Sequence, residues 1–173
     1  MFLVLRAVDI IKAEHAALAQ GVMALAMPAL FWAFFHVCKS VATAPLGALS
    51  DRVGRKNLIR LGWAIYALVY LGFAFMNRSW QAWPLFAVYA LYYGLTEGVE
   101  KALVVDLAPP ELKGTAVGMY NLTIGVAALP ASVVFGLVYA RVGALVAFGY
   151  AGVLAMLAML VLSVKVQEKV RAA

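Results

Sequence analysis

Charged and metal-binding side chains are scarce in this sequence. Of its 173 residues, 14 are Lys or Arg and 8 are Asp or Glu, giving a net charge of +6. Charged residues make up 13% of the chain, about half their share in an ordinary soluble domain. A single cysteine excludes an intramolecular disulfide, and one cysteine with two histidines is too few for a convincing metal cage. The sequence therefore indicates no disulfide scaffold, metal centre or cofactor.

Apolar residues, by contrast, dominate the composition. They make up 66% of the chain, and the mean hydropathy is +0.94, whereas a soluble domain is roughly 45–50% apolar. A chain this short cannot hide so much apolar surface in one globular core. The composition therefore disfavours a soluble enzyme, a disordered tail and a nucleic-acid-binding module. It indicates a membrane protein surrounded by lipid.

Five apolar stretches are long enough to cross a bilayer, whose hydrocarbon core of about 30 Å needs roughly 20 helical residues. Helices are expected because an open sheet leaves backbone groups unpaired in lipid, and barrel strands would alternate polar and apolar residues. The sequence predicts an all-α membrane protein with five transmembrane helices, at Ala19–Leu46, Leu58–Met76, Ala82–Leu107, Thr115–Ala140 and Val142–Val164.

The basic residues predict the orientation of these helices. Cytoplasmic loops of membrane proteins are enriched in Lys and Arg. One set of helix ends carries Arg52, Arg55, Lys56, Arg60, Lys113, Lys165, Lys169 and Arg171, whereas the other carries Arg6, Lys12, Arg78 and Arg141. The richer set is expected in the cytoplasm together with the C-terminus, so that five crossings put the N-terminus outside. Because the opening residues MFLVLRA look like the end of a further helix, we expect the chain to be a piece of a longer protein. The expected parts are a helix remnant and external loop (1–15), a transmembrane domain (16–164) and a cytoplasmic tail (165–173).

The segment between the first two predicted helices contains a specific motif. It reads GALSDRVGRK, with Gly47, Asp51, Arg52, Gly54, Arg55 and Lys56 at its defining positions. It resembles the G-x-L-a-D-R-x-G-R-[KR] signature of the major facilitator superfamily (MFS). We interpret it as a cytoplasmic loop in which Gly47 lets helices approach, Gly54 permits a tight turn, and the basic side chains stay in water. The alternative is a merely basic loop.

The resemblance implies a fold, a function and a partner. Members have twelve helices in two six-helix halves, and this chain fits helices eight to twelve with a stub of the seventh, which is most of one half. The implied function is transport of a small solute across a cytoplasmic membrane, expected to be bacterial, by alternating access. The implied partner is a missing N-terminal half. The resemblance also implies a cytoplasmic latch formed by Asp51, Arg52 or Arg55, and Asp106.

Four charged residues lie away from the ends of the predicted spans, where charges are costly and usually meet a partner or a cavity. Lys39 lies twelve residues before Asp51, or about 18 Å, and Glu97 lies nine residues before Asp106, or about 13 Å. These similar depths predict one polar patch of Lys39, Glu97, Glu100 and Lys101, with Trp32, His36, Tyr93 and Asn121 as its rim. Three roles remain open for the patch: a structural ion-pair network, a substrate or proton site, or a cytoplasmic gate.

The sequence also leaves the function open between three classes. The first is a secondary transporter, with proton coupling through Glu97 or Glu100 as an option because burial raises the pKa of a carboxylate. The second is a truncated, non-transporting membrane protein, or a half that requires a partner half. A membrane enzyme is disfavoured, because the sequence shows no nucleophile–base pair, metal-ligand set or phosphate loop.

Overall fold

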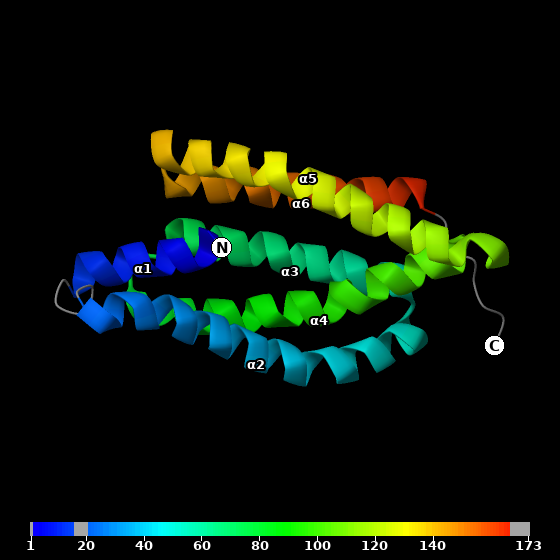
Figure 1. Cartoon of the computed structure of the whole chain (residues 1–173), viewed down its shortest axis with the longest axis horizontal. Coiled ribbons are helices and arrows are strands. Elements are labelled where there is room, and N and C mark those ends of the chain that lie inside the picture. Colours follow the sequence, from blue (N-terminus) through cyan, green and yellow to red (C-terminus); the bar gives the residue numbers. More distant parts are fainter. Residues whose placement is uncertain (1, 16–20, 167–173) are drawn as a thin grey trace.

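The structure is a computed structural model that describes residues 2–15 and 21–166, with the side chains of these ranges except those of residues 21–25 and 51. Long helices make up nearly all of this part of the chain (Figure 1). They are α1 (Phe2–Glu14), α2 (Gly21–Val53), α3 (Arg55–Phe75), α4 (Ala82–Leu107), α5 (Lys113–Arg141) and α6 (Ala144–Lys165), with short 3-10 turns η2 (Ser79–Gln81) and η3 (Pro110–Leu112).

The all-α membrane fold predicted from the sequence is confirmed, and each predicted span corresponds to one helix. Four helices, α2, α3, α5 and α6, are both long enough and apolar enough to cross a membrane. The remaining predicted span coincides with α4, which has the length, 26 residues, but carries four charged residues and several tyrosines. That α4 also crosses the membrane stays a prediction.

The motif between the first two spans is not the loop that the sequence predicted. Helix α2 continues through Val53, and α3 begins at Arg55, so that Gly54 alone separates them. The backbone N–H of Gly54 still donates to Ser50 O at 3.1 Å, and Leu58 N–H donates to Gly54 O at 3.3 Å. Gly54 turns the chain with φ 93°, a conformation that only glycine adopts readily. One residue therefore suffices where a loop was expected.

Helix α4 is the central element of the bundle. It packs along α2 on one side and α3 on another, and α3 also packs along α6. Figure 1 shows the resulting layers, with α2 and α4 together, α3 beside α1, and α5 with α6. Phenylalanine rings fill the interior between them; those of Phe31, Phe73, Phe86 and Phe148 are almost fully buried. Phe135 is the one buried residue of α5. The other side chains of this helix are therefore at least partly exposed.

Two glycines set the close approach of the helices around α4. A Cβ at Gly94 would lie 2.8 Å from Leu46 Cδ1, and one at Gly62 would lie 2.5 Å from Thr96 Cγ2. A side chain at Gly62 would clash with Thr96 and crowd the Cβ of Leu95 at 3.3 Å, whereas one at Gly94 would displace the Leu46 side chain and crowd the backbone of Ala42 at 3.3 Å. The close contact at Gly94 brings the polar middle of α2 within reach of α4.

Helix α1 is fastened to the end of the bundle opposite the motif. Arg6 Nη2 donates to the carbonyl oxygen of Met76 at 2.8 Å, and Tyr139 OH donates to Asp9 Oδ2 at 2.6 Å. Ser79 N–H donates to Glu14 Oε2 at 2.8 Å. Hydrogen bonds from the side chain and then the backbone of Ser79 lower the pKa of the Glu14 carboxyl. These contacts position α1 against α3 and α5.

Candidate functional site

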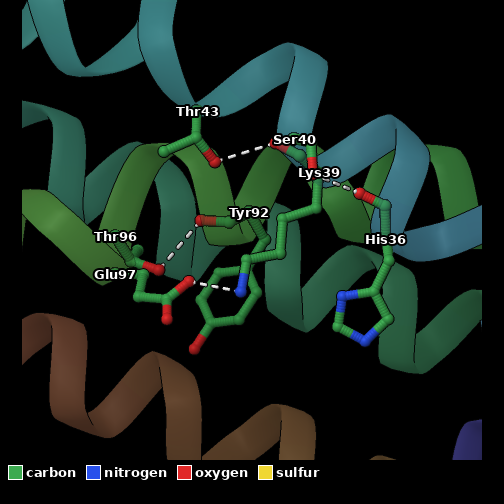
Figure 2. Close-up of polar contacts among 7 residues, drawn as sticks. All are labelled: His36, Lys39, Ser40, Thr43, Tyr92, Thr96 and Glu97. Carbon is green, nitrogen blue, oxygen red and sulfur yellow. Dashed lines mark hydrogen bonds and ion pairs between the residues drawn. The ribbon is translucent and has the colours of Figure 1, made fainter.

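An ion pair joins α2 to α4 in the polar middle of the two helices. Lys39 Nζ lies 2.5 Å from Glu97 Oε2, with side chains 22% and 43% exposed. Figure 2 shows the two side chains extending toward one another from their separate helices. The pair therefore lies at an open face of the described bundle and not in its packed core, which leaves the Glu97 carboxylate accessible.

One aromatic ring contacts the lysine end of this pair, and further rings pack against one another on the preceding turns of α2. Lys39 Nζ lies 4.9 Å from the ring centroid of Tyr93, within the distance of a cation–π contact. The exposed His36 ring packs edge-on against Trp32 and Phe35, with centroids 5.3 and 5.2 Å apart. The sequence-predicted residues Lys39, Glu97, Tyr93, His36 and Trp32 thus lie on adjoining turns of α2 and α4.

The hydroxyl groups near the pair are turned back to their own helices. Ser40 Oγ donates to His36 O at 2.9 Å, Thr43 Oγ1 to Lys39 O at 2.8 Å, and Thr96 Oγ1 to Tyr92 O at 2.9 Å (Figure 2). These are the usual bonds of Ser and Thr to the carbonyl one turn back. Of the polar side chains drawn in Figure 2, Lys39 and Glu97 make the contact between helices.

Glu100 belongs to a different cluster, which corrects the prediction of one four-residue patch. Its carboxylate accepts hydrogen bonds from Trp63 Nε1 at 2.9 Å and from Tyr120 OH at 2.5 Å. The hydrogen bonds of Glu100 thus go to α3 and α5, whereas the ion pair of Glu97 goes to α2. The Lys101 and Asn121 side chains are exposed, and the ion pairs of the described residues do not include Lys101.

A second ion pair lies where α2 meets α3. Arg55 Nη1 lies 2.7 Å from Asp106 Oδ2 and donates to the carbonyl oxygen of Ala102 at 2.5 Å. Asp106 occupies the last turn of α4, where the helix dipole disfavours an acidic group. The positive charge of the Arg55 guanidinium offsets this unfavourable interaction. The side chains are 15% and 32% exposed. Of the two arginines considered for a latch, the structure places Arg55 on Asp106.

The other motif residues differ in their contacts and exposure. Lys56 Nζ donates to the backbone oxygens of Ser163, at 2.9 Å, and Val166, at the C-terminal end of α6. Arg52 is exposed. The prediction that Arg55 and Lys56 stay in water is therefore wrong, because both tie the α2–α3 junction to helix ends. Gly47 has open space around it, and the side chain of Asp51 lies outside the described part of the structure.

Two side chains that sequence reasoning missed take part in these contacts. Trp63 and Tyr120 donate hydrogen bonds to Glu100. A signal existed for Trp63, because an indole N–H in an apolar span needs an acceptor. Nothing in the chain distinguished Tyr120 from its neighbour Asn121, since the rotation of α5 against α4 decides which of them faces Glu100.

The arrangement of charged side chains between helices suits binding and conformational change better than catalysis. Within residues 2–15 and 21–166, no group of three or more His, Cys, Asp or Glu side chains could hold a metal ion. The charged groups instead form pairs between separate helices, and such pairs can part and re-form when helices move.

Comparison with known proteins places these contacts in a family context. The family model described as the Major Facilitator Superfamily matches residues 4–173. An uncharacterized MFS-type transporter of Methanocaldococcus jannaschii is 32% identical over 162 residues, which cover 94% of this chain and 39% of that relative. The chain thus spans well under half the length of this relative. No solved structure matches the chain significantly.

Proposed function

Because the chain belongs to the major facilitator superfamily, we propose that it forms part of a secondary active transporter that moves a small solute across a membrane by alternating access. The observation that carries this proposal is the Lys39–Glu97 pair, whose members come from two helices and remain accessible on an open face. Charged residues within membrane spans commonly mark substrate or ion pathways. Glu97 is proposed to exchange Lys39 for a substrate group or a proton during the cycle.

The Arg55–Asp106 pair is proposed to act as a cytoplasmic latch in the same cycle. It connects the junction of α2 and α3 to the last turn of α4, so that it is sensitive to relative movement of these helices. Asp51 lies four residues before Arg55 and carries the only acidic group of the motif. We propose that Asp51 belongs to the latch as well.

Transport by the purified protein in proteoliposomes tests the proposal directly. Among radiolabelled sugars, amino acids, organic cations and organic anions, we expect at least one to accumulate above protein-free vesicles when a pH gradient is imposed. Glu97→Gln removes the charge that Lys39 contacts, so we expect it to slow this uptake by about tenfold or more. The exposed Glu111 in η3 gives a matched control, and Glu111→Gln should transport at the wild-type rate. Wild-type uptake in the Glu97→Gln variant would contradict the proposed role of the pair.

A second candidate function is that of a half that transports only with a partner half. The observation that favours it is α5, whose 29 residues include one buried side chain, Phe135. Its exposed face carries glycines at 114, 118 and 125, where a Cβ would meet nothing within 4 Å, and small residues let another helix come close. Absence of uptake by the chain alone, with uptake restored by co-expression of the rest of a longer protein, would favour this function.

The basic residues support a topology in which the α2–α3 junction and the C-terminus face the cytoplasm. Two exposed asparagines, Asn57 at this junction and Asn77 at the opposite end, make a matched pair for its test. In a Cys38→Ala background, we expect Asn77→Cys to react with a membrane-impermeant maleimide on intact cells. Asn57→Cys should react only after permeabilisation. The reverse labelling would contradict the orientation.

A further inference from the structure

A cavity lies between α3, α4, α5 and α6, and neither Lys39 nor Glu97 lines it. Its volume is about 420 Å³, and residues of α3, α4, α5 and α6 line it, with Phe2 of α1 at its edge. Pockets that bind small molecules have volumes of about 300–1,000 Å³. The cavity is therefore large enough for a ligand that carries one aromatic ring.

Aromatic rings and small side chains line the cavity. The rings include four tyrosines and a tryptophan, Trp63, Tyr66, Tyr70, Tyr92 and Tyr150. Tyr66 stacks on Tyr70 with centroids 4.0 Å apart and lies 5.0 Å from Tyr92. The lining also includes small residues, the alanines of α6 and Ala131 and Ser132 of α5, which take up little of the space. The faces of aromatic rings carry negative charge density and attract cations.

The carboxylate of Glu100 does not line this cavity but is hydrogen-bonded to a residue that does. Trp63 lines the cavity and donates its Nε1–H to Glu100, and Tyr92, two helical turns before Glu100, lines it as well. The two hydrogen-bond donors to Glu100, Trp63 and Tyr120, are both neutral. The ion pairs of the described side chains do not include Glu100. A carboxylate within a helix bundle in a membrane calls for a compensating cation or proton.

We propose that this cavity binds a monovalent organic cation with an aromatic or alkyl substituent, whose charge the tyrosine rings and Glu100 stabilise. No Lys or Arg lines the cavity, which disfavours an anion. A neutral apolar ligand would leave Glu100 without a counter-charge. The proposal rests on the proposed transport function, for which it names the substrate class.

Binding of a matched pair of probes to the purified protein in lipid nanodiscs tests this proposal. Benzyltrimethylammonium carries a quaternary ammonium, and neopentylbenzene has the same shape with a neutral carbon in its place. Equilibrium dialysis, corrected for empty nanodiscs, should show that the cation binds at least about tenfold more tightly than the neutral analogue. Equal binding of the two, or no binding of the cation, would overturn the proposal.

Variants locate the bound cation. Glu100→Gln keeps a hydrogen-bond acceptor and removes the charge, so we expect it to weaken cation binding by about tenfold without changing binding of the neutral probe. Tyr66→Leu removes a ring and should weaken cation binding about fivefold or more, whereas Tyr66→Phe should restore it. The two Tyr66 variants keep the test decisive even where Glu100→Gln fails to fold. If Glu97→Gln abolished binding and Glu100→Gln did not, the cation would bind at the Lys39–Glu97 pair and the cavity proposal would be wrong.

Uptake of radiolabelled benzyltrimethylammonium into proteoliposomes separates this proposal from the proposed function. Binding with the expected variant pattern but without uptake supports the cavity site and counts against transport by this chain. Uptake of other solutes, without binding of the cation, supports transport and overturns the cavity site.

Discussion

Lys39→Ala is expected to lower the free energy of unfolding by about 3 kcal/mol, the cost of a lone charge within a transmembrane helix. The wild-type lysine lies 2.5 Å from Glu97 Oε2. Its removal leaves this carboxylate without its cation and also removes the contact with the Tyr93 ring. Unfolding by SDS titration in mixed micelles measures the effect.

The double variant Lys39→Met with Glu97→Gln shows whether the loss of stability comes from an unpaired charge or from the missing lysine side chain. Replacing both charges removes the penalty of an unpaired ion, and we expect most of the lost stability to return. A double-mutant cycle then gives a coupling energy of about 1–3 kcal/mol. Lys101→Met, at an exposed position on α4, serves as a control and should change stability by less than about 0.5 kcal/mol. Additive effects of the two single variants would show that Lys39 and Glu97 act independently.

Arg55→Gln is expected to cost about 2 kcal/mol of unfolding free energy, in the range for a hydrogen bond to a charged group. The guanidinium contacts both Asp106 and the carbonyl oxygen of Ala102. Glutamine is too short and uncharged to make both contacts. The loss should free the last turn of α4, which we expect to appear as faster amide hydrogen exchange over residues 102–107.

The neighbouring motif arginine provides a matched control for this experiment. Arg52 is exposed at the end of α2, and Arg52→Gln should leave both stability and exchange near wild-type values. If the two arginine variants behaved alike, the effect would come from the charge of the motif in general. The assignment of the latch to Arg55 and Asp106 would then be wrong.

The sequence by itself was sufficient to predict the helices. Each of the five predicted spans corresponds to an observed helix, and Ala82–Leu107 has the same bounds in both. The reason is that lipid offers no hydrogen-bond partners to the backbone, so that a long apolar segment has little choice but to form a helix. The motif GALSDRVGRK likewise pointed to the family, because it specifies residues at fixed spacing.

The tertiary structure alone decided which side chains meet. Lys39 and Glu97 were predicted to share a depth, since depth follows from counting residues along a helix. Their neighbour Glu100 contacts Trp63 and Tyr120 instead. Residues three apart lie only about 60° apart around a helix, so the rotation of α3 and α5 against α4 decides which partner each one meets. The same holds at the motif, where Gly54 alone turns the chain and places Arg55 on Asp106. Apolar patterns indicate which segments form helices, whereas helix rotation and crossing arise from packing between segments far apart in the sequence.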